Sequence, residues 1–259
     1  MLYIKNYEVS YSMKSITLYQ GDCLKIMSEI PDESIDMIFV DLPYGITKNK
    51  WDITIPFDLL WKQYERIIKE HGAIIFTATQ PFASQLVVSN PKLFRYDIIW
   101  EKTISSGQMN VLNQPMRSHE LILVFYKKLP TYNEQRTEGT PYEIHRDGNY
   151  KPGSYNPQKN THKKNDGFRH ARSVIKISNP RIKDGHPTQK PVKLLEYLIK
   201  TYTNVGDVVL DNCMGSGSTG KACQNLKRKF IGIELNETYF QKAKKWLDEG
   251  TNEFFSQES

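Results

Sequence analysis

The alternation of strand and helix is clearest near the C-terminus, where residues 207–234 read DVVLDNCMGSGSTGKACQNLKRKFIGIE. Apolar runs at 207–211 and 230–234 predict two strands, and residues 218–226 between them predict a helix. A turn rich in glycine joins the first strand to this helix. Strand, helix and strand in this order are typical of an α/β sheet with parallel strands.

The same rhythm extends over most of the 259 residues. Further strands are predicted at residues 16–19, 35–40, 73–77, 96–100 and 121–126, and further helices at 22–29, 57–70, 191–202 and 237–248. The pattern favours a doubly wound, mostly parallel sheet of seven strands, in which ligands bind beyond the carboxyl ends of the strands. Asp41, Asp211 and Glu234 each lie at such an end, so we expect a site there.

Composition separates residues 130–180 from the rest of the chain. Apolar runs vanish in this interval, which holds nine Lys or Arg against five acids, whereas the whole chain has 35 against 29 and a net charge of +6. Aromatic residues are interleaved with these basic residues, namely Tyr132, Tyr142, Tyr150, Tyr155 and Phe168. We therefore divide the chain into residues 1–129, an irregular insertion at 130–180, and residues 181–259. The insertion is predicted to contact nucleic acid, and a solvated, partly disordered segment is the alternative.

Cysteine and histidine usage predicts no metal site. The three cysteines form no CxxC pair, and the histidines lack the spacing of metal ligands. No apolar run approaches the roughly 18 residues of a membrane span, and the N-terminus lacks the apolar core of a signal peptide. We therefore expect a soluble, cytoplasmic protein with no membrane association.

The glycine-containing turn is a candidate cofactor loop. Gly215, Gly217 and Gly220 match the pattern GxGxxG, in which glycines let the backbone pass close to a ligand. Glu234, at the end of the next strand, can accept hydrogen bonds from ribose hydroxyls. A dinucleotide and S-adenosylmethionine both fit, but Asp211 favours the second, because a carboxylate attracts its cationic amino-acid end and repels a pyrophosphate. A tight turn beside an ordinary surface glutamate is the plainer alternative.

A second loop follows the strand at 35–40 and reads Asp41-Leu42-Pro43-Tyr44-Gly45. It resembles the Asp-Pro-Pro-Tyr signature of amino-methylating DNA methyltransferases, and residues 211–220 resemble their Phe-x-Gly-x-Gly cofactor loop. The order of the motifs resembles the β group of that family: Gly21-Asp22-Cys23-Leu24, the Asp41 loop, a variable segment, His186-Pro-Thr-Gln-Lys-Pro191 and the cofactor loop. The resemblance covers nearly everything except residues 130–180 and the termini. It departs from the family pattern at Leu42, where proline is usual, and at Cys213, where phenylalanine is usual.

The resemblance implies a fold of the S-adenosylmethionine-dependent methyltransferase type and a site-specific enzyme that methylates adenine N6 in DNA by base flipping. Asp41 and the carbonyl of Leu42 would accept the two N–H groups of the target amine, with Pro43 holding position 42 extended. Tyr44 would stack on the flipped base. The cofactor-binding residues that the resemblance implies are Asp22, Cys23, Asp41, Thr188, Lys190, Asp211, Asn212, Cys213, Gly215, Ser216, Gly217 and Glu234. Thr188 and Lys190 would contact the cofactor carboxylate, and the insertion would recognise the target sequence. A homodimer and a cognate restriction endonuclease also accord with the resemblance.

Three alternatives remain open on the sequence. Cytosine N4 methylation fits because the same two acceptors serve either amine. An NAD-dependent oxidoreductase fits GxGxxG but leaves residues 41–45 and the basic insertion unexplained. A catalytically idle nucleic-acid-binding module predicts DNA binding that depends on salt and needs no cofactor.

Overall fold

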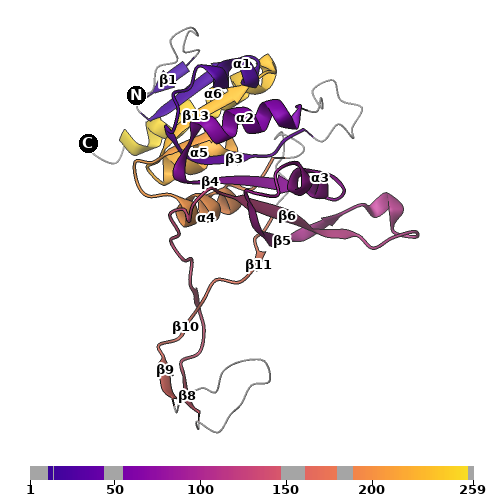
Figure 1. The fold of residues 1–259 in the computed structure, drawn as a ribbon, viewed down its shortest axis with the longest axis vertical. Coiled ribbons are helices and arrows are strands. Elements are labelled where there is room, and N and C mark those ends of the chain that lie inside the picture. Colours follow the sequence, from indigo (N-terminus) through magenta and orange to yellow (C-terminus); the bar gives the residue numbers. More distant parts are fainter. Residues whose placement is uncertain (1–10, 14, 44–54, 147–160, 180–188, 256–259) are drawn as a thin grey trace. The chain divides into compact units, whose positions relative to one another are not determined.

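The computed structural model describes residues 11–13, 15–43, 55–146, 161–179 and 189–255 (Figure 1). The chain consists of two compact units. The first comprises Met1–Asn133 and Ser173–Ser259, and the second comprises Glu134–Arg172.

The first unit contains a nine-stranded sheet in the order β1-β2-β13-β12-β3-β4-β6-β5-β11. The strands are β1 (Tyr11–Met13), β2 (Ile16–Gln20), β3 (Ile35–Val40), β4 (Ile68–Ala78), β5 (Phe94–Ser106), β6 (Arg117–Phe125), β11 (Val174–Lys176), β12 (Val208–Asp211) and β13 (Lys229–Glu234). β1 and β6 run antiparallel to the other seven. The predicted mostly parallel α/β sheet is confirmed, and its seven predicted strands are flanked by two additional edge strands of three residues each.

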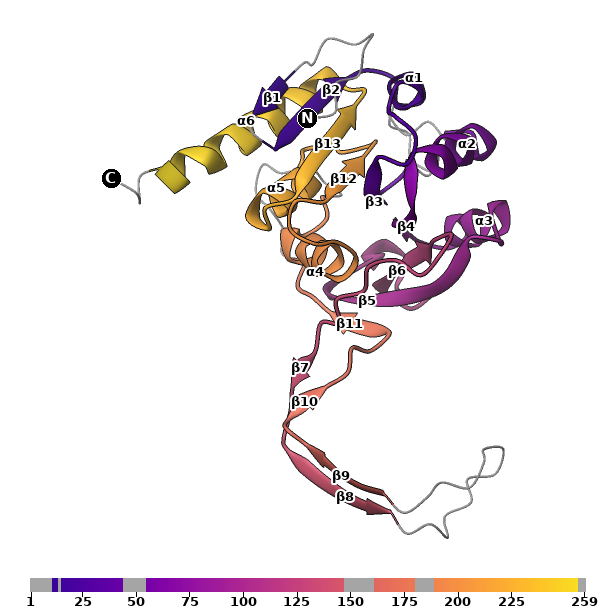
Figure 2. The same cartoon turned by 60° about the vertical axis from the view of Figure 1, so that its left-hand side comes forward.

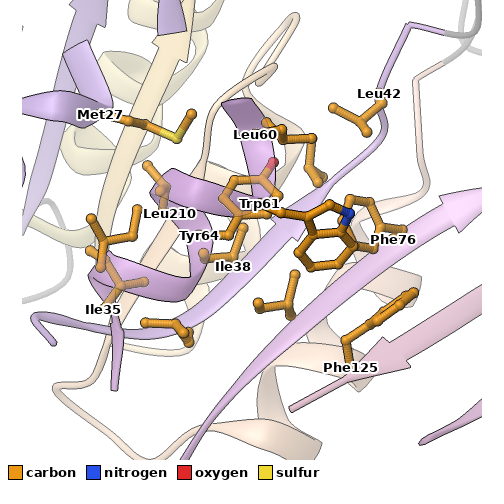
Figure 3. Close-up of a cluster of buried hydrophobic side chains, with 14 of the residues drawn as sticks. Met27, Ile35, Ile38, Leu42, Leu60, Trp61, Tyr64, Phe76, Phe125 and Leu210 are labelled. Carbon is orange, nitrogen blue, oxygen red and sulfur yellow. The ribbon is translucent and has the colours of Figure 1, made fainter. Parts of the chain in front are cut away.

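Helices cover both faces of this sheet. They are α1 (Cys23–Ser28), α2 (Phe57–Ile67), α3 (Phe82–Ser89), α4 (Val192–Tyr202), α5 (Ser218–Asn225) and α6 (Glu237–Phe255), with a 3-10 turn, η1, at Gln108–Asn110. Helices α1 to α3 pack with one set of strand side chains, part of which is shown in Figure 3, and α4 to α6 pack with the other set. β3 contributes Ile38 and Val40 to the first cluster and Met37 and Phe39 to the second, as alternation along a strand buried on both faces requires. No helix among the described residues is long and apolar enough to cross a membrane.

The element boundaries differ from the prediction in the first unit. The helix predicted to reach residue 70 ends at Ile67, because Ile68 already pairs with Ile35 of the neighbouring strand. β5 and β6 are longer than predicted and form an antiparallel hairpin whose outer part carries little apolar alternation. Helix α3, at residues 82–89, was not predicted.

The second unit has more regular structure than its composition indicated. It contains β7 (Thr137–Glu138), β8 (Tyr142–Arg146), β9 (Thr161–Asn165) and β10 (Phe168–Arg169), paired antiparallel as β7 with β10 and β8 with β9. Most of their described side chains are exposed, so these strands lack the apolar alternation by which a strand is recognised in a sequence.

The topology identifies one place in the sheet where a ligand is expected. β3 and β12 are neighbours, paired through Met37 and Val209, and the chain leaves them in opposite directions, from β3 to β4 and from β12 to β13 (Figure 2). Such a switch point opens a crevice beyond the carboxyl ends of the two strands. Asp41 and Asp211 lie at these two ends.

Candidate active site

Two hydrogen bonds hold the carboxylate of Asp41 at the end of β3. The Thr77 hydroxyl, from the neighbouring strand β4, donates to Asp41 Oδ1 at 2.7 Å. Lys190 Nζ donates to Asp41 Oδ2 at 2.7 Å. Each oxygen therefore has a fixed donor, and the plane of the carboxylate is set before any substrate binds.

Lys190 belongs to a chain of alternating buried charges. Its Nζ lies 3.3 Å from Glu120 Oε2, and Lys102 Nζ lies 3.1 Å from Glu120 Oε1. Burial by itself lowers the pKa of Lys190, but the carboxylates of Asp41 and Glu120 outweigh it and raise that pKa above its usual value. Burial likewise opposes ionisation of Glu120, but Lys190 and Lys102 bring its pKa below the usual range. Lys190 and Glu120 therefore remain charged at neutral pH.

The side chain of Leu42 belongs to the core. It is 4% exposed and packs in the cluster that contains Leu60 and Trp61 of α2 (Figure 3). A leucine where the family usually has proline therefore contributes to packing. Pro43 is half-buried, and Tyr44 lies outside the described residues.

Asp211 is a buried carboxylate at the end of β12. It accepts hydrogen bonds from the Thr219 hydroxyl at 2.6 Å and from the backbone N–H of Cys213 at 3.1 Å. Burial, with smaller contributions from Asp41 and Glu234, raises the pKa of Asp211 to about 7. A buried acid that is costly to ionise lies where a cationic ligand group would stabilise its charge.

The three glycines of the GxGxxG pattern differ in their surroundings. At Gly215, where φ is +53°, an added Cβ would meet no protein atom within 4 Å, so its open side can face a ligand. A Cβ on Gly217 would approach Ala243 to 3.0 Å, and one on Gly220 would approach Phe230 to 2.8 Å. The latter two glycines therefore serve close packing of α5, and only the first borders open space.

Glu234 organises the loops at the end of β13. Its Oε2 accepts from the backbone N–H of Gly215 at 2.9 Å, and its Oε1 accepts from that of Asn236 at 2.8 Å. Burial raises the pKa of Glu234. Its backbone carbonyl accepts from Gly21 N–H at 2.9 Å, which ties the end of β2 to the same edge. Asp22 next to it caps α1 through its side chain.

The remaining predicted cofactor residues lie in the same loops. Asn212 Oδ1 accepts from the hydroxyl of buried Tyr64 at 2.5 Å. The thiols of Cys23 and Cys213 interact, and this hydrogen bond and burial raise the pKa of Cys213. Ser216 Oγ donates to Gln189 at 3.1 Å and so joins the cofactor loop to the segment before α4. Thr188 lies outside the described residues.

This donor set fits S-adenosylmethionine. Asp211 offers a carboxylate for the cationic amino-acid end, Glu234 offers one for ribose hydroxyls, and Gly215 borders open space in the same loop. The arrangement gives a pyrophosphate little counter-charge, since both side chains are acids.

Sequence reasoning missed three participants, Thr77, Lys102 and Glu120. Glu120 is the fourth residue of β6 and directly precedes the apolar run of that strand. Because β6 is antiparallel to its neighbours, its start lies at the same edge as the ends of β3 and β12. The sequence shows that an acid precedes the apolar run, but it does not show the direction of the strand. The proximity of Glu120 to Asp41 could therefore not be predicted.

The second unit carries a small group of exposed metal-ligand types. Ligand atoms of Glu143, His145 and His162 lie within 4.8 Å of one another, the two imidazole rings stack at 4.2 Å, and His162 forms a hydrogen bond with Glu143. All three side chains are exposed, and the hydrogen bond together with the ring stacking accounts for their arrangement. The absence of a metal site stays a prediction.

Comparison with known proteins gives a consistent family. The DNA methylase family, whose members methylate adenine N6 or cytosine N4, matches residues 35–245. The chain is 32% identical to the DNA adenine methyltransferase YhdJ of Escherichia coli (strain K12), over 90% of this chain and 82% of the relative. It is 30% identical to the type II methyltransferase M.HpaI of Haemophilus parainfluenzae, over 91% of this chain and 75% of the relative.

Solved structures agree with the fold and the cofactor. The M1.HpyAVI–SAM complex superimposes with a TM-score of 0.62 at 26% identity and covers 90% of this chain and 100% of that one. The cytosine-N4-specific PvuII methyltransferase gives a TM-score of 0.68 at 16% identity, covering 92% and 88%, which is a likeness of fold. The predicted cofactor, S-adenosylmethionine, is confirmed, and the oxidoreductase alternative is set aside. The chain therefore belongs to the N6-adenine and N4-cytosine family of DNA methyltransferases, enzymes that use S-adenosylmethionine to methylate an exocyclic amine of a base at specific DNA sites.

Proposed function

We propose that this DNA methyltransferase acts on adenine N6, with Asp41 as the residue that receives the target amine. The observation that carries this assignment is the Asp41 carboxylate, fixed between Thr77 and Lys190 at the switch point of the sheet. The relative YhdJ, which is named as a DNA adenine methyltransferase, supports adenine over cytosine.

The chemistry requires a group that makes the amine nucleophilic. An adenine amine is a poor nucleophile because its lone pair is delocalised into the ring. Asp41 accepts one of its N–H bonds and the Leu42 carbonyl accepts the other, which localises electron density on nitrogen and orients it for in-line attack. The bound cofactor supplies an electrophilic methyl group on a sulfonium. Tyr44 stacks on the base after it leaves the duplex.

The cofactor is held by the loops after β2, β12 and β13. Asp211 binds the cationic amino group, Glu234 binds the ribose hydroxyls, and the open side of Gly215 lies against the ligand. Asp22, Cys23, Asn212, Cys213, Ser216 and Gly217 shape this pocket, with Thr188 at the carboxylate end. For Lys190 we propose a different role from the one the resemblance implied, namely positioning of Asp41, because its ammonium is already paired with two carboxylates.

The finer biological setting is part of the same proposal. The Glu134–Arg172 unit, inside the interval 130–180, recognises the target sequence through its eight Lys or Arg and interleaved aromatic residues. The enzyme works in the cytoplasm, where its DNA substrate is accessible, and pairs with a cognate restriction endonuclease. A homodimer is the expected assembly by resemblance to the β group.

Replacing Asp41 by alanine tests the catalytic role. We expect Asp41→Ala to lose methyl transfer by at least about a hundredfold, because an acceptor used in the transition state is removed, while S-adenosylhomocysteine binds normally. The control is Asp97→Ala, an exposed acid on β5 that should retain full activity. Comparable activity in the two variants contradicts the mechanism.

Mass spectrometry of nucleosides from modified DNA decides between the two bases. N6-methyl-2′-deoxyadenosine supports the proposal. N4-methyl-2′-deoxycytidine instead makes cytosine the target base, with the same residues in the same roles.

A further inference from the structure

The hairpin formed by β5 and β6 ends in an exposed apolar tip at residues 104–116. Met109 is 99% exposed and Leu112 is 94% exposed, with Val111 between them at 54%. Every residue from Ser106 to His119 is exposed. Several large apolar side chains gathered in solvent on one projection indicate a surface that contacts another molecule.

This tip projects from the edge of the sheet that carries the active site. β6 pairs with β4 as far as Leu121 and Ala78, the last residue of β4, and Thr77 beside it contacts Asp41. β6 extends four residues beyond that level, to Arg117, which is roughly 14 Å at the rise of an extended strand. In Figure 1 the hairpin runs past the end of β4 toward the right of the view.

The base of the hairpin is joined to the catalytic residue. Glu120 on β6 contacts Lys190, which contacts Asp41, so two ion pairs connect the base of the hairpin to the site. Asn179 reinforces β5 by accepting from the N–H of Ile104 at 2.8 Å and donating to its carbonyl at 2.9 Å. Contacts with residues outside the hairpin therefore hold its base in place.

Hydrogen bonds within the tip give it a defined shape. The N–H groups of Asn113 and Gln114 donate to the carbonyl of Asn110 at 2.9 and 3.0 Å. Gln108 Nε2 donates to the carbonyl of Ser105 at 2.9 Å. The turns are closed by their own backbone, and the apolar side chains are not needed for that closure.

The charge and the side-chain types of the tip are suited to contact with the base stack of a DNA duplex. Residues 102–119, the outer part of the hairpin, contain no Asp or Glu that would repel phosphates, and Arg117 adds a positive charge. Four amide side chains surround the apolar ones and can form hydrogen bonds with base edges: Gln108, Asn110, Asn113 and Gln114. Apolar side chains that enter between base steps unstack them and stabilise a distorted duplex.

We propose that Met109 and Leu112 form a wedge that enters the base stack beside the target base and stabilises the gap left when that base flips out. This inference rests on the proposed base-flipping mechanism. It assigns the tip a role separate from the Glu134–Arg172 unit, since the wedge acts on the stack and need not read the sequence.

Kinetics on matched and mismatched DNA test the wedge. The target site is first mapped by methylation-sensitive sequencing of plasmid DNA treated with the wild-type protein, and short duplexes are made with that site. We expect Met109→Ala/Leu112→Ala to lower kcat/KM on the paired duplex by about tenfold or more. A mismatch opposite the target base, which lowers the cost of flipping, should bring the variant within about threefold of wild type. Val88→Ala/Val205→Ala, which removes two exposed apolar side chains elsewhere, is the control and should match wild type on both duplexes.

Two results overturn the proposal. One is an equal loss on paired and mismatched duplexes, which indicates a general defect. The other is a fall in mass by light scattering together with that equal loss, which makes the tip a contact between copies of the chain.

A photo-crosslinking measurement remains decisive if the wild-type protein methylates no base and the proposed function fails. Benzoylphenylalanine introduced at position 112 should crosslink to labelled plasmid fragments in the presence of S-adenosylhomocysteine, and the same group at position 205 should not. Absence of a crosslink at 112 contradicts contact of the tip with DNA.

Discussion

At the residue scale, we propose that Lys190 positions Asp41 and does not bind the cofactor. The family resemblance implied a contact with the cofactor carboxylate, whereas its ammonium contacts Asp41 and Glu120. We expect Lys190→Met to lower kcat at saturating cofactor by about 10- to 100-fold, because Asp41 loses a charged donor that fixes its orientation. Affinity for S-adenosylhomocysteine should change little, as measured by calorimetry.

The opposite result would restore the original expectation for Lys190. A loss of cofactor affinity with kcat retained indicates that the ammonium binds the cofactor carboxylate. Lys193→Met, an exposed lysine on the first turn of α4, controls for the loss of a positive charge and should behave as wild type in both measurements.

Asp211 makes the stability of the ligand-free protein depend on pH. Burial raises its pKa to about 7 in the folded state, above its value in an unfolded chain, so the folded state holds this proton more tightly. Its contribution to stability is therefore greatest below about pH 4 and is lost as the pH rises through 7. The loss is on the order of 4 kcal/mol at most, from about three pKa units at roughly 1.4 kcal/mol each.

The variant Asp211→Asn should remove this dependence. We expect its free energy of unfolding, from urea titrations between pH 5 and pH 8, to fall less with pH than that of wild type. Asp58→Asn, an exposed acid in the first turn of α2, is the control. Parallel pH profiles for wild type and Asp211→Asn would show that Asp211 ionises in the fold as it does in water.

At the scale of elements, two glycines on either side of β12 have a similar backbone conformation but only one of them lies in the cofactor loop. Gly215 and Gly206 both have positive φ, +53° and +87°, and at neither would a Cβ meet an atom within 4 Å. Alanine at either position should cost about 1–2 kcal/mol of backbone strain. Gly215→Ala alone should also weaken S-adenosylhomocysteine binding, by about tenfold or more, because only its open side borders the cofactor loop.

Calorimetry with thermal unfolding checks this pair. Similar decreases in Tm, with cofactor binding weakened by about tenfold or more only in Gly215→Ala, support the proposed pocket. Equal cofactor binding by both variants would contradict the proposal that the cofactor lies against Gly215.

The parts of the fold that were predictable are those with strong periodicity. The seven central strands are rich in apolar residues because helices cover both faces of the sheet. Apolar runs at residues 35–40 and 207–211 therefore predicted strands there. The same runs placed Asp41 and Asp211 at strand ends. The strands of the second unit were not recognised, since they are exposed and polar. Glu120 and Thr77 were missed because their proximity to Asp41 depends on strand order and direction, which no local pattern contains.

At the scale of the whole molecule, we expect the two units to divide the work of binding DNA. The first carries the sheet, the cofactor loops and the β5–β6 hairpin, and the second, Glu134–Arg172, carries eight Lys or Arg against five acids. A unit with few buried apolar side chains and an excess of positive charge is suited to follow the phosphate backbone. On this proposal, sequence recognition would depend on amide and guanidinium groups that the backbone contact brings to the base edges.

Removing two charges from the second unit tests this division. Lys163 and Lys164 are exposed neighbours on β9, and we expect Lys163→Ala/Lys164→Ala to weaken DNA binding and to reduce the slope of log K against log salt by up to about 2, or about 1 for each phosphate that is no longer neutralised. Fluorescence anisotropy over a salt series measures both quantities. Lys128→Ala/Lys229→Ala removes the same charge from exposed positions near the amino ends of the parallel strands, opposite the active-site edge, and should leave the slope unchanged. If the two double variants lower affinity and slope equally, DNA is attracted by net charge alone, and the Glu134–Arg172 unit has no special part in binding it.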